Sequence, residues 1–227
     1  MTGTSPSGLT IHDLEVRFPG LEHPALAIAA LDLAAGAQVA VTGPSGCGKT
    51  TLLNILTGLE RIRHGAVVWQ GVDLARLGEG ARDRWRAQNV GLVMQDFHLF
   101  PGLSAFDNVV LPQRLSHVRL PASVKGEAQR LLERVGIAAP EQPIETMSRG
   151  QMQRVAVARA LVARPRILVA DEPTASLDGE AGAVVADLLV ELAGEAGATL
   201  IVASHDVRLV GRLGRVLRLE DGRLVDR

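Results

Sequence analysis

The chain has 227 residues, of which 47% are hydrophobic and 22% charged, a composition typical of a folded soluble domain. The formal net charge is −1, so there is no overall basic field of the kind that attracts nucleic acid or anionic lipid. A single cysteine excludes an internal disulfide and a cysteine-rich zinc site, and no apolar run reaches the roughly 18 residues that a membrane-crossing helix needs.

Residues 1–8 are small and polar, so we expect a flexible tail followed by one folded unit over residues 9–227. Alternating apolar positions predict a strand over residues 11–18, a short apolar run predicts another over 39–42, and a helix is expected over 49–57. Further strands are expected over residues 67–69, 90–94, 167–170 and 200–203. The last two are continuous apolar runs, which are typical of strands buried on both faces.

Helical periodicity dominates much of the second half of the chain. Apolar residues at positions 152, 155, 156, 160 and 163 share one helical face, as do those at 185, 188, 189 and 192. Strand signals vanish over about 97–160, so we expect a helical subdomain inserted into an α/β core with a mainly parallel sheet. The Asp221-Gly222 pair between apolar runs at 215–219 and 223–225 predicts a closing hairpin.

Residues 43–50 read GPSGCGKT and match the pattern G-x-x-x-x-G-K-[ST] in full. Its glycines let backbone N–H groups turn toward phosphates, and the helix that follows adds its positive dipole end. Lys49 is expected to reach the β- and γ-phosphates, Thr50 to ligate Mg²⁺ and Thr51 to contact the α-phosphate. The nucleotide-binding residues predicted for this loop are Gly43, Pro44, Ser45, Gly46, Cys47, Gly48, Lys49, Thr50 and Thr51.

A pair of acidic residues follows the buried run at 167–170. Asp171 is expected at the carboxyl edge of the sheet, where ligands of open α/β sheets bind, and is the predicted metal-shell carboxylate. Glu172 lies one residue further out and is the predicted general base for the attacking water. The alternative is an acidic pair that merely caps a strand before Pro173, and the phosphate loop in the same chain argues against it.

Residues 146–154, TMSRGQMQR, resemble the signature segment of ABC-type ATPases, usually L-S-G-G-Q followed by a polar pair and Arg. The VAVARAL run at 155–161 is similar to the helix that follows in that family. Four further positions occur in the family's order: Phe18 resembles its adenine-stacking aromatic, Gln95 its Q-loop glutamine, Ser176-Leu177-Asp178 its D-loop and His205 its switch histidine. The resemblance covers essentially all of residues 9–225.

This resemblance implies a P-loop nucleotide-hydrolase core, an antiparallel β subdomain and an inserted helical subdomain, with ATP and Mg²⁺ as ligands. It also implies head-to-tail pairing of two copies, in which the signature of one chain closes over the ATP held by the other. The Ser148 hydroxyl and the Gly150 N–H would form an anion site at a helix N-terminus. Gln151 would bind nucleotide beside them, and Asp178 would act across the interface.

The resemblance also assigns the roles in hydrolysis. Gln95 would contact the metal and the attacking water, and His205 would contact the γ-phosphate. The predicted catalytic residues are then Glu172, His205, Gln95 and Lys49. The predicted metal ligands are Thr50, Gln95 and Asp171.

Three positions depart from the family's usual residues. Met147 replaces a leucine, which is a mild apolar swap. Phe18 stands where tyrosine is usual, and stacking on a base needs only an aromatic face. Arg149 replaces the first glycine of the signature pair, so its side chain must either point away from the phosphate or add positive charge near it.

The apolar residues between Gln95 and Phe106 either pack the helical subdomain or form a groove for a partner's helix, and their position beside Gln95 favours the groove. Residues 95–112 are similar to the family branch that serves lipoprotein release, macrolide and haem export and cell-division signalling. Members of that branch drive separate membrane permeases from the cytoplasmic face of the inner membrane.

We therefore expect the ATPase subunit of an exporter or mechanotransmitter, peripheral to that membrane, with a second copy of itself and an integral membrane permease as partners. A soluble ATPase acting on DNA or ribosomes is one alternative. The single phosphate loop and the lack of heptads or a basic stripe argue against it, and no nucleic acid is expected as a partner. An importer subunit is the other alternative, and such subunits often carry extra sequence after the last hairpin.

Overall fold

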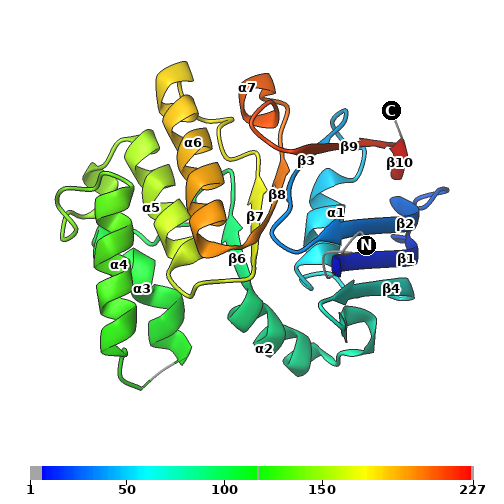
Figure 1. The fold of residues 1–227 in the computed structure, drawn as a ribbon, viewed down its shortest axis with the longest axis horizontal. Helices are drawn as coiled ribbons and strands as arrows, with labels where there is room; N and C mark the ends of the chain where they lie inside the picture. The colour runs from blue at the N-terminus through cyan, green and yellow to red at the C-terminus, as the bar shows by residue number, and fades with distance from the viewer. Residues whose placement is uncertain (1–6, 117, 226–227) are drawn as a thin grey trace, which may run out of the picture.

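Two β-sheets and a set of flanking helices organise the chain (Figure 1). The computed structural model describes residues 7–116 and 118–225. The smaller sheet is antiparallel, with strand order β2-β1-β4-β5. Its strands are β1 (Ser7–Val16), β2 (Leu26–Ala34), β4 (His64–Trp69) and β5 (Val72–Asp73).

The larger sheet has six strands in the order β10-β9-β3-β8-β7-β6, and all its pairs are parallel except β9 with β10. Its strands are β3 (Gln38–Thr42), β6 (Val90–Val93), β7 (Ile167–Asp171), β8 (Thr199–Ala203), β9 (Arg215–Glu220) and β10 (Arg223–Val225). The predicted mainly parallel sheet and the closing hairpin are confirmed.

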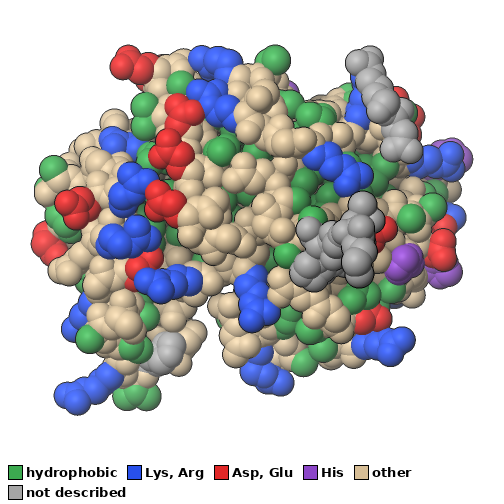
Figure 2. Space-filling view, in the orientation of Figure 1, with side chains coloured by type: hydrophobic (Ala, Val, Ile, Leu, Met, Phe, Trp, Pro, Cys, Tyr) green, Lys and Arg blue, Asp and Glu red, His purple; other side chains and the backbone are tan. Residues whose placement is uncertain are grey.

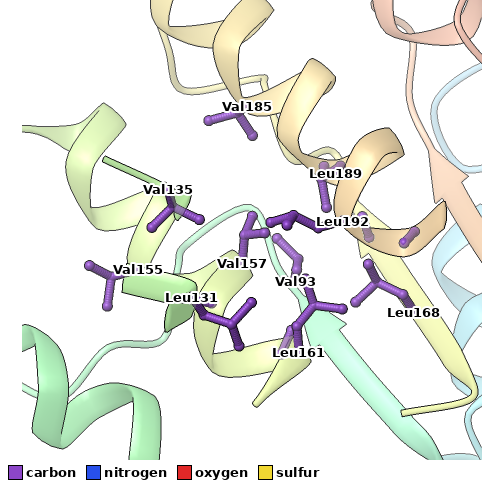
Figure 3. Close-up of a cluster of buried hydrophobic side chains, with 14 of the residues drawn as sticks. Val93, Leu131, Val135, Val155, Val157, Leu161, Leu168, Val185, Leu189 and Leu192 are labelled. Atoms are coloured by element: carbon purple, nitrogen blue, oxygen red, sulfur yellow. The ribbon is translucent and has the colours of Figure 1, made fainter. Parts of the chain in front are cut away.

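The central strands are buried on both faces, and their side chains alternate between two hydrophobic cores. Val39 and Val41 of β3 face one core, which also contains the apolar side of α1 (Lys49–Leu56). Ala40 between them faces the other core, which Leu168 of β7 also joins. That second core is filled from helices on the opposite face of the sheet (Figure 3). This period-two division is why continuous apolar runs mark these strands in the sequence.

The regular structure between β6 and β7 is helical, with loops between the helices. They are α3 (Ala105–Ser116), α4 (Ala122–Arg134), a 3₁₀ turn at Ile144–Thr146 and α5 (Arg149–Leu161). Among the described residues of this segment, the only β pairing is an isolated bridge between Ser104 and Pro143. The predicted helical insertion is therefore confirmed. Helix α6 (Gly179–Ala196) packs beside α5, and α7 (Val207–Val210) follows β8.

Several elements were not predicted. These are β2, the two-residue strand β5, a 3₁₀ turn at Leu74–Arg76 and the charged helix α2 (Glu79–Asn89). The predicted tail over residues 1–8 ends too late, because β1 begins at Ser7, and residues 1–6 lie outside the described part of the chain. In the portion of the chain that the structure describes, no helix is both long and apolar enough to cross a membrane.

Candidate active site

The phosphate loop connects the end of β3 to the start of α1, as its sequence pattern requires. Gly43, Gly46 and Gly48 all have positive φ angles, of 150°, 78° and 105°. Two of them also need the absence of a side chain. A Cβ on Gly43 would lie 2.1 Å from the carbonyl oxygen of Leu219, and one on Gly48 would lie 2.8 Å from that of Ala25. The glycine pattern is therefore fixed by close backbone approach as well as by conformation.

The side chain of Lys49 folds back over this loop. Its Nζ donates hydrogen bonds to the carbonyl oxygens of Gly43 at 2.8 Å and Pro44 at 3.0 Å. Pro44 and Ser45 are exposed, whereas Cys47 is buried in the core beneath the loop. A positive ammonium group held above a ring of backbone groups at a helix N-terminus is suited to bind phosphate.

The metal-binding pair predicted from sequence is in contact. The Thr50 hydroxyl donates a 2.9 Å hydrogen bond to Oδ2 of Asp171, the last residue of β7. Burial raises the pKa of Asp171, and the nearby Glu172 charge adds to this, while the Thr50 hydrogen bond and the Lys49 charge oppose it. A hydroxyl and a carboxylate are the oxygen ligands that Mg²⁺ takes beside nucleotide phosphates, so the residues present fit this ion.

Sheet register brings Glu172 and His205 to the same edge. Asp171 pairs with Ala203 across β7 and β8, and the Glu172 N–H donates to the Ala203 carbonyl at 2.8 Å. His205 Nδ1 lies 2.9 Å from Glu172 Oε2, an ion-pair distance when the imidazole is protonated. The contact lacks the angle of a hydrogen bond, and within the described residues this buried oxygen has no hydrogen-bond donor. Glu172 thus places a carboxylate oxygen beside His205, at the carboxyl edge of the sheet, where it accepts no hydrogen bond from the described residues. A carboxylate in this position suits a general base.

The signature residues form a separate group. Ser148 is the N-cap of α5, where its hydroxyl accepts from the Gln151 N–H at 3.2 Å and its own N–H donates to Gln151 Oε1 at 2.9 Å. In this capping box the hydrogen of the Ser148 hydroxyl remains free to donate. The side-chain oxygen Oε1 of Gln151, however, is already occupied by the Ser148 N–H. Asp178 caps α6 by accepting from the N–H groups of Glu180 and Ala181. Ser148, Gly150, Gln151 and Asp178 line one groove of about 310 Å³ between α5 and α6.

Phe18 and Gln95 lie at the ends of strands. Phe18 follows β1 with 37% of its surface exposed, and it lines a hollow of about 520 Å³ formed by residues 15–21, 60, 61 and 63. Gln95 is exposed after β6, and its carbonyl oxygen accepts a 3.4 Å hydrogen bond from the Ser176 hydroxyl. Arg149 points away from the helix end, toward Ser176 and the ring of Phe97.

Sequence reasoning missed two polar residues that hold the site. Gln153 on α5 is fully buried and donates from Nε2 to the Pro173 carbonyl at 2.8 Å, directly after Glu172. Asp206 caps α7 and accepts from the Thr174 hydroxyl at 3.2 Å. Burial alone would raise the pKa of Asp206, but hydrogen bonds from Arg208 and Thr174 hold it below its usual range. Both residues lack a spacing pattern of their own, so only the fold reveals them.

Comparison with known proteins agrees with this geometry. A family model described as ABC transporter matches residues 26–175. The lipoprotein-releasing system ATP-binding protein LolD of Idiomarina loihiensis is 41% identical over 192 residues, which span 84% of this chain and 83% of that protein. The uncharacterized ABC transporter ATP-binding protein YbbA of Escherichia coli K12 is 41% identical over 217 residues, 94% of this chain and 95% of that one.

A solved structure shares the whole fold. It is the dimeric, post-hydrolysis state of the ATP-binding cassette MJ0796 bound to ADP and Pi, with a TM-score of 0.85 and 30% identity over 96% of this chain and 97% of that chain. The likeness includes both sheets and the helical insertion, and it confirms the fold predicted from the motifs. The chain therefore belongs to the ABC transporter family, as an ATP-binding and ATP-hydrolysing subunit.

Proposed function

We propose that two copies of the chain pair head to tail, with each ATP held between the phosphate loop of one copy and the Ser148–Gly150 end of α5 in the other. The observation that carries this proposal is the placement of the two anion-binding helix ends. Helix α1 packs on one face of the six-stranded sheet, and α5 packs on the other (Figure 1). A second copy would supply the missing half of the site, and the similar MJ0796 cassette has a dimeric structure.

Within that dimer each predicted residue has a defined task. Lys49 and the loop N–H groups bind the phosphates, Thr51 contacts the α-phosphate and Phe18 stacks on the base. Thr50, Asp171 and Gln95 would hold Mg²⁺, which supplies charge neutralisation at the phosphates when bound.

Glu172 takes the proton of the attacking water, and His205 stabilises the charge of the γ-phosphate. The Oε2 of Glu172 accepts no hydrogen bond from the described residues and lies beside His205, which supports its role as base. The exposed imidazole of His205 supports its contact with a nucleotide that enters from outside the monomer.

The partner permease docks in a groove of about 370 Å³ between α2, β6, α3 and α5. Figure 2 shows the hollow between the lobe of α3 and α4 and the lobe that carries α2. The groove includes Met94, which directly precedes the predicted docking segment between Gln95 and Phe106, and His98, which lies within that segment. Part of that segment instead packs inward, because Phe97 is buried and Phe106 contacts the helical core, whereas Phe100 stays exposed.

The chain works at the cytoplasmic face of the inner membrane, in the branch of the family that drives export or force transmission through a separate permease. The relative named for lipoprotein release supports this assignment. A net charge of −1 gives no support to the nucleic-acid alternative. An importer permease is the remaining alternative, and co-purification with either class of permease distinguishes the two.

The test combines Glu172→Gln with size-exclusion chromatography and ATPase assays, with and without ATP. We expect the variant to lose turnover, keep ATP binding and become a dimer only when ATP is present. Glu79→Gln, the same change at an exposed position on α2, should hydrolyse ATP at the wild-type rate and serves as the control. Normal turnover in Glu172→Gln would show that another group is the base. An ATP-bound variant that stays monomeric would contradict the paired site.

A further inference from the structure

The side chain of Arg149 joins three segments of the chain. Arg149 is the first residue of α5, directly after the Ser148 cap. Its Nε donates a 3.1 Å hydrogen bond to the carbonyl oxygen of Ser176. Its guanidinium carbon lies over the ring of Phe97, 5.2 Å from the ring centre, which is cation–π geometry. A glycine at this position could make neither contact.

Both partners of Arg149 lie in segments that carry predicted active-site residues. Ser176 lies between Glu172 and Asp178, in the turn that connects β7 to α6. Phe97 lies two residues after Gln95 and has a positive φ of 58°, so its backbone is held in an uncommon conformation. The Ser176 hydroxyl also donates to the Gln95 carbonyl, which closes a triangle between the three segments.

A second arginine binds the backbone carbonyl of Phe97. Arg159, nearly three turns further along α5, donates from Nη2 to the Phe97 carbonyl at 2.6 Å. Phe97 is buried, so the guanidinium of Arg149 lies against an aromatic ring that is packed in the protein interior. Among the described residues, no carboxylate lies within ion-pair distance of Arg149. Its position is therefore set by the carbonyl and the aromatic face alone.

We propose that Arg149 is a positioning residue that ties the N-terminus of α5 to the Gln95–Phe97 segment and to the Glu172–Asp178 turn. The three segments then move as one unit when the partner's ATP contacts Ser148 and Gly150. Arg149 acts through the backbone of Ser176 and the ring of Phe97 and does not touch nucleotide. The effect of Arg149 on turnover rests on the proposed paired site. The contacts by which Arg149 holds the three segments together lie within one chain.

The first measurement is hydrogen–deuterium exchange of the nucleotide-free protein, which depends on neither pairing nor hydrolysis. Arg149→Ala should raise amide exchange in both the 95–98 and the 173–178 segments. Arg119→Ala, which removes an exposed arginine elsewhere in the helical insertion, should change neither. Unchanged exchange in the two segments of Arg149→Ala would overturn the tie, whatever the ATPase assays show.

The second measurement is steady-state ATPase activity. Arg149→Ala should lower kcat by roughly tenfold and leave KM nearly unchanged, because the chain's own phosphate loop is intact. Phe97→Leu keeps an apolar side chain but removes the aromatic face, and the two substitutions together should lower kcat no more than Arg149→Ala alone. Additive losses would overturn the proposal and point to a direct contact of Arg149 with phosphate. If Arg149→Ala raises amide exchange in the 95–98 and 173–178 segments but leaves kcat unchanged, the positioning role is overturned.

Wild-type protein measured in parallel separates this inference from the function on which it rests. A wild type that neither pairs nor hydrolyses ATP contradicts the proposed function, while the exchange data still decide whether Arg149 holds the three segments together.

Discussion

At the scale of single residues, the phosphate loop shows that its glycines are needed for different reasons. Gly43 and Gly46 both have positive φ angles, so any other residue would be strained at either position. Of these two glycines, only Gly43 lies close to another strand, because a Cβ added to it would approach Leu219 of β9. A Cβ on Gly46 would meet nothing within 4 Å. The two positions therefore separate the cost of backbone strain from the cost of a steric clash.

Gly46→Ala should lower the free energy of unfolding by about 1–2 kcal/mol, the cost of a left-handed conformation. Gly43→Ala should cost at least about 3 kcal/mol, because its Cβ would lie 2.1 Å from the Leu219 carbonyl oxygen and β9 would have to shift. Urea unfolding without nucleotide measures both changes on the apo-protein. Equal losses at the two positions would show that strand β9 yields easily and that the clash is not decisive.

At the scale of secondary-structure elements, α5 has two tasks. Its first turn carries the Ser148–Gly150 end that we propose binds the partner's nucleotide, and its second turn holds the segment directly after Glu172, the proposed base. Gln153 performs the second task from inside the protein, where its Nε2 donates to the Pro173 carbonyl. Its other polar atom, Oε1, is buried and has no hydrogen-bond partner in the described parts of the chain. The amide therefore contributes its donor to this segment while its buried oxygen adds no hydrogen bond.

Gln153→Met keeps the length of the side chain but removes the donor. The Pro173 carbonyl then loses its partner, while the unsatisfied Oε1 disappears, so the net loss in unfolding free energy should be only about 1 kcal/mol. The turn after Glu172 becomes free to move, so kcat should fall while KM for ATP changes little.

The same substitution at the exposed Gln88 on α2 is the matched control and should change neither quantity. A full wild-type kcat in Gln153→Met would show that the base is positioned without this hydrogen bond.

The predicted elements differ from the unpredicted ones in how their residues are buried. Strands such as β7 and β8 are buried on both faces and appear as continuous apolar runs. Strand β2 is covered on one face only, and its alternation is obscured because the exposed Ala29 and Ala30 count as apolar in the sequence. Helix α2 buries only Trp85, and its Arg82 and Arg86 bond to the distant Gly58 carbonyl, so no apolar stripe marks it.

The candidate site divides in the same way. The placement of Lys49, Thr50 and Asp171 at one edge of the sheet was predictable, because the proposed phosphate-binding and metal-binding roles need fixed residue types at fixed places beside a strand. The contacts of Arg149 were not, because its partners lie in other loops and are a backbone carbonyl and an aromatic ring. Long-range contacts to the backbone leave no residue pattern in a single sequence.

At the scale of the whole molecule, a cluster of charges joins the helical insertion to the core. Glu127 of α4 is 9% exposed and contacts Arg130 at 2.8 Å and Arg164, beyond the end of α5, at 2.9 Å. Arg130 and Arg134 reach Glu195 near the end of α6. The hydrogen bond from Arg130 lowers the pKa of Glu127 below its usual value, against the opposing effect of burial, and Arg164 adds to the shift.

Because the folded-state pKa of Glu127 lies below its unfolded value, its contribution to stability is full above the unfolded pKa and disappears as the pH falls through the folded pKa. Glu127→Gln should therefore lower the unfolding free energy by about 1–2 kcal/mol at pH 7, a range that allows for the partial exposure of both arginines. The difference from wild type should shrink as the pH falls below about 4.5. Glu133→Gln, an exposed position on the same helix, is the control. A difference that stays constant from pH 7 to acid would mean that Glu127 stabilises the junction by packing rather than by charge.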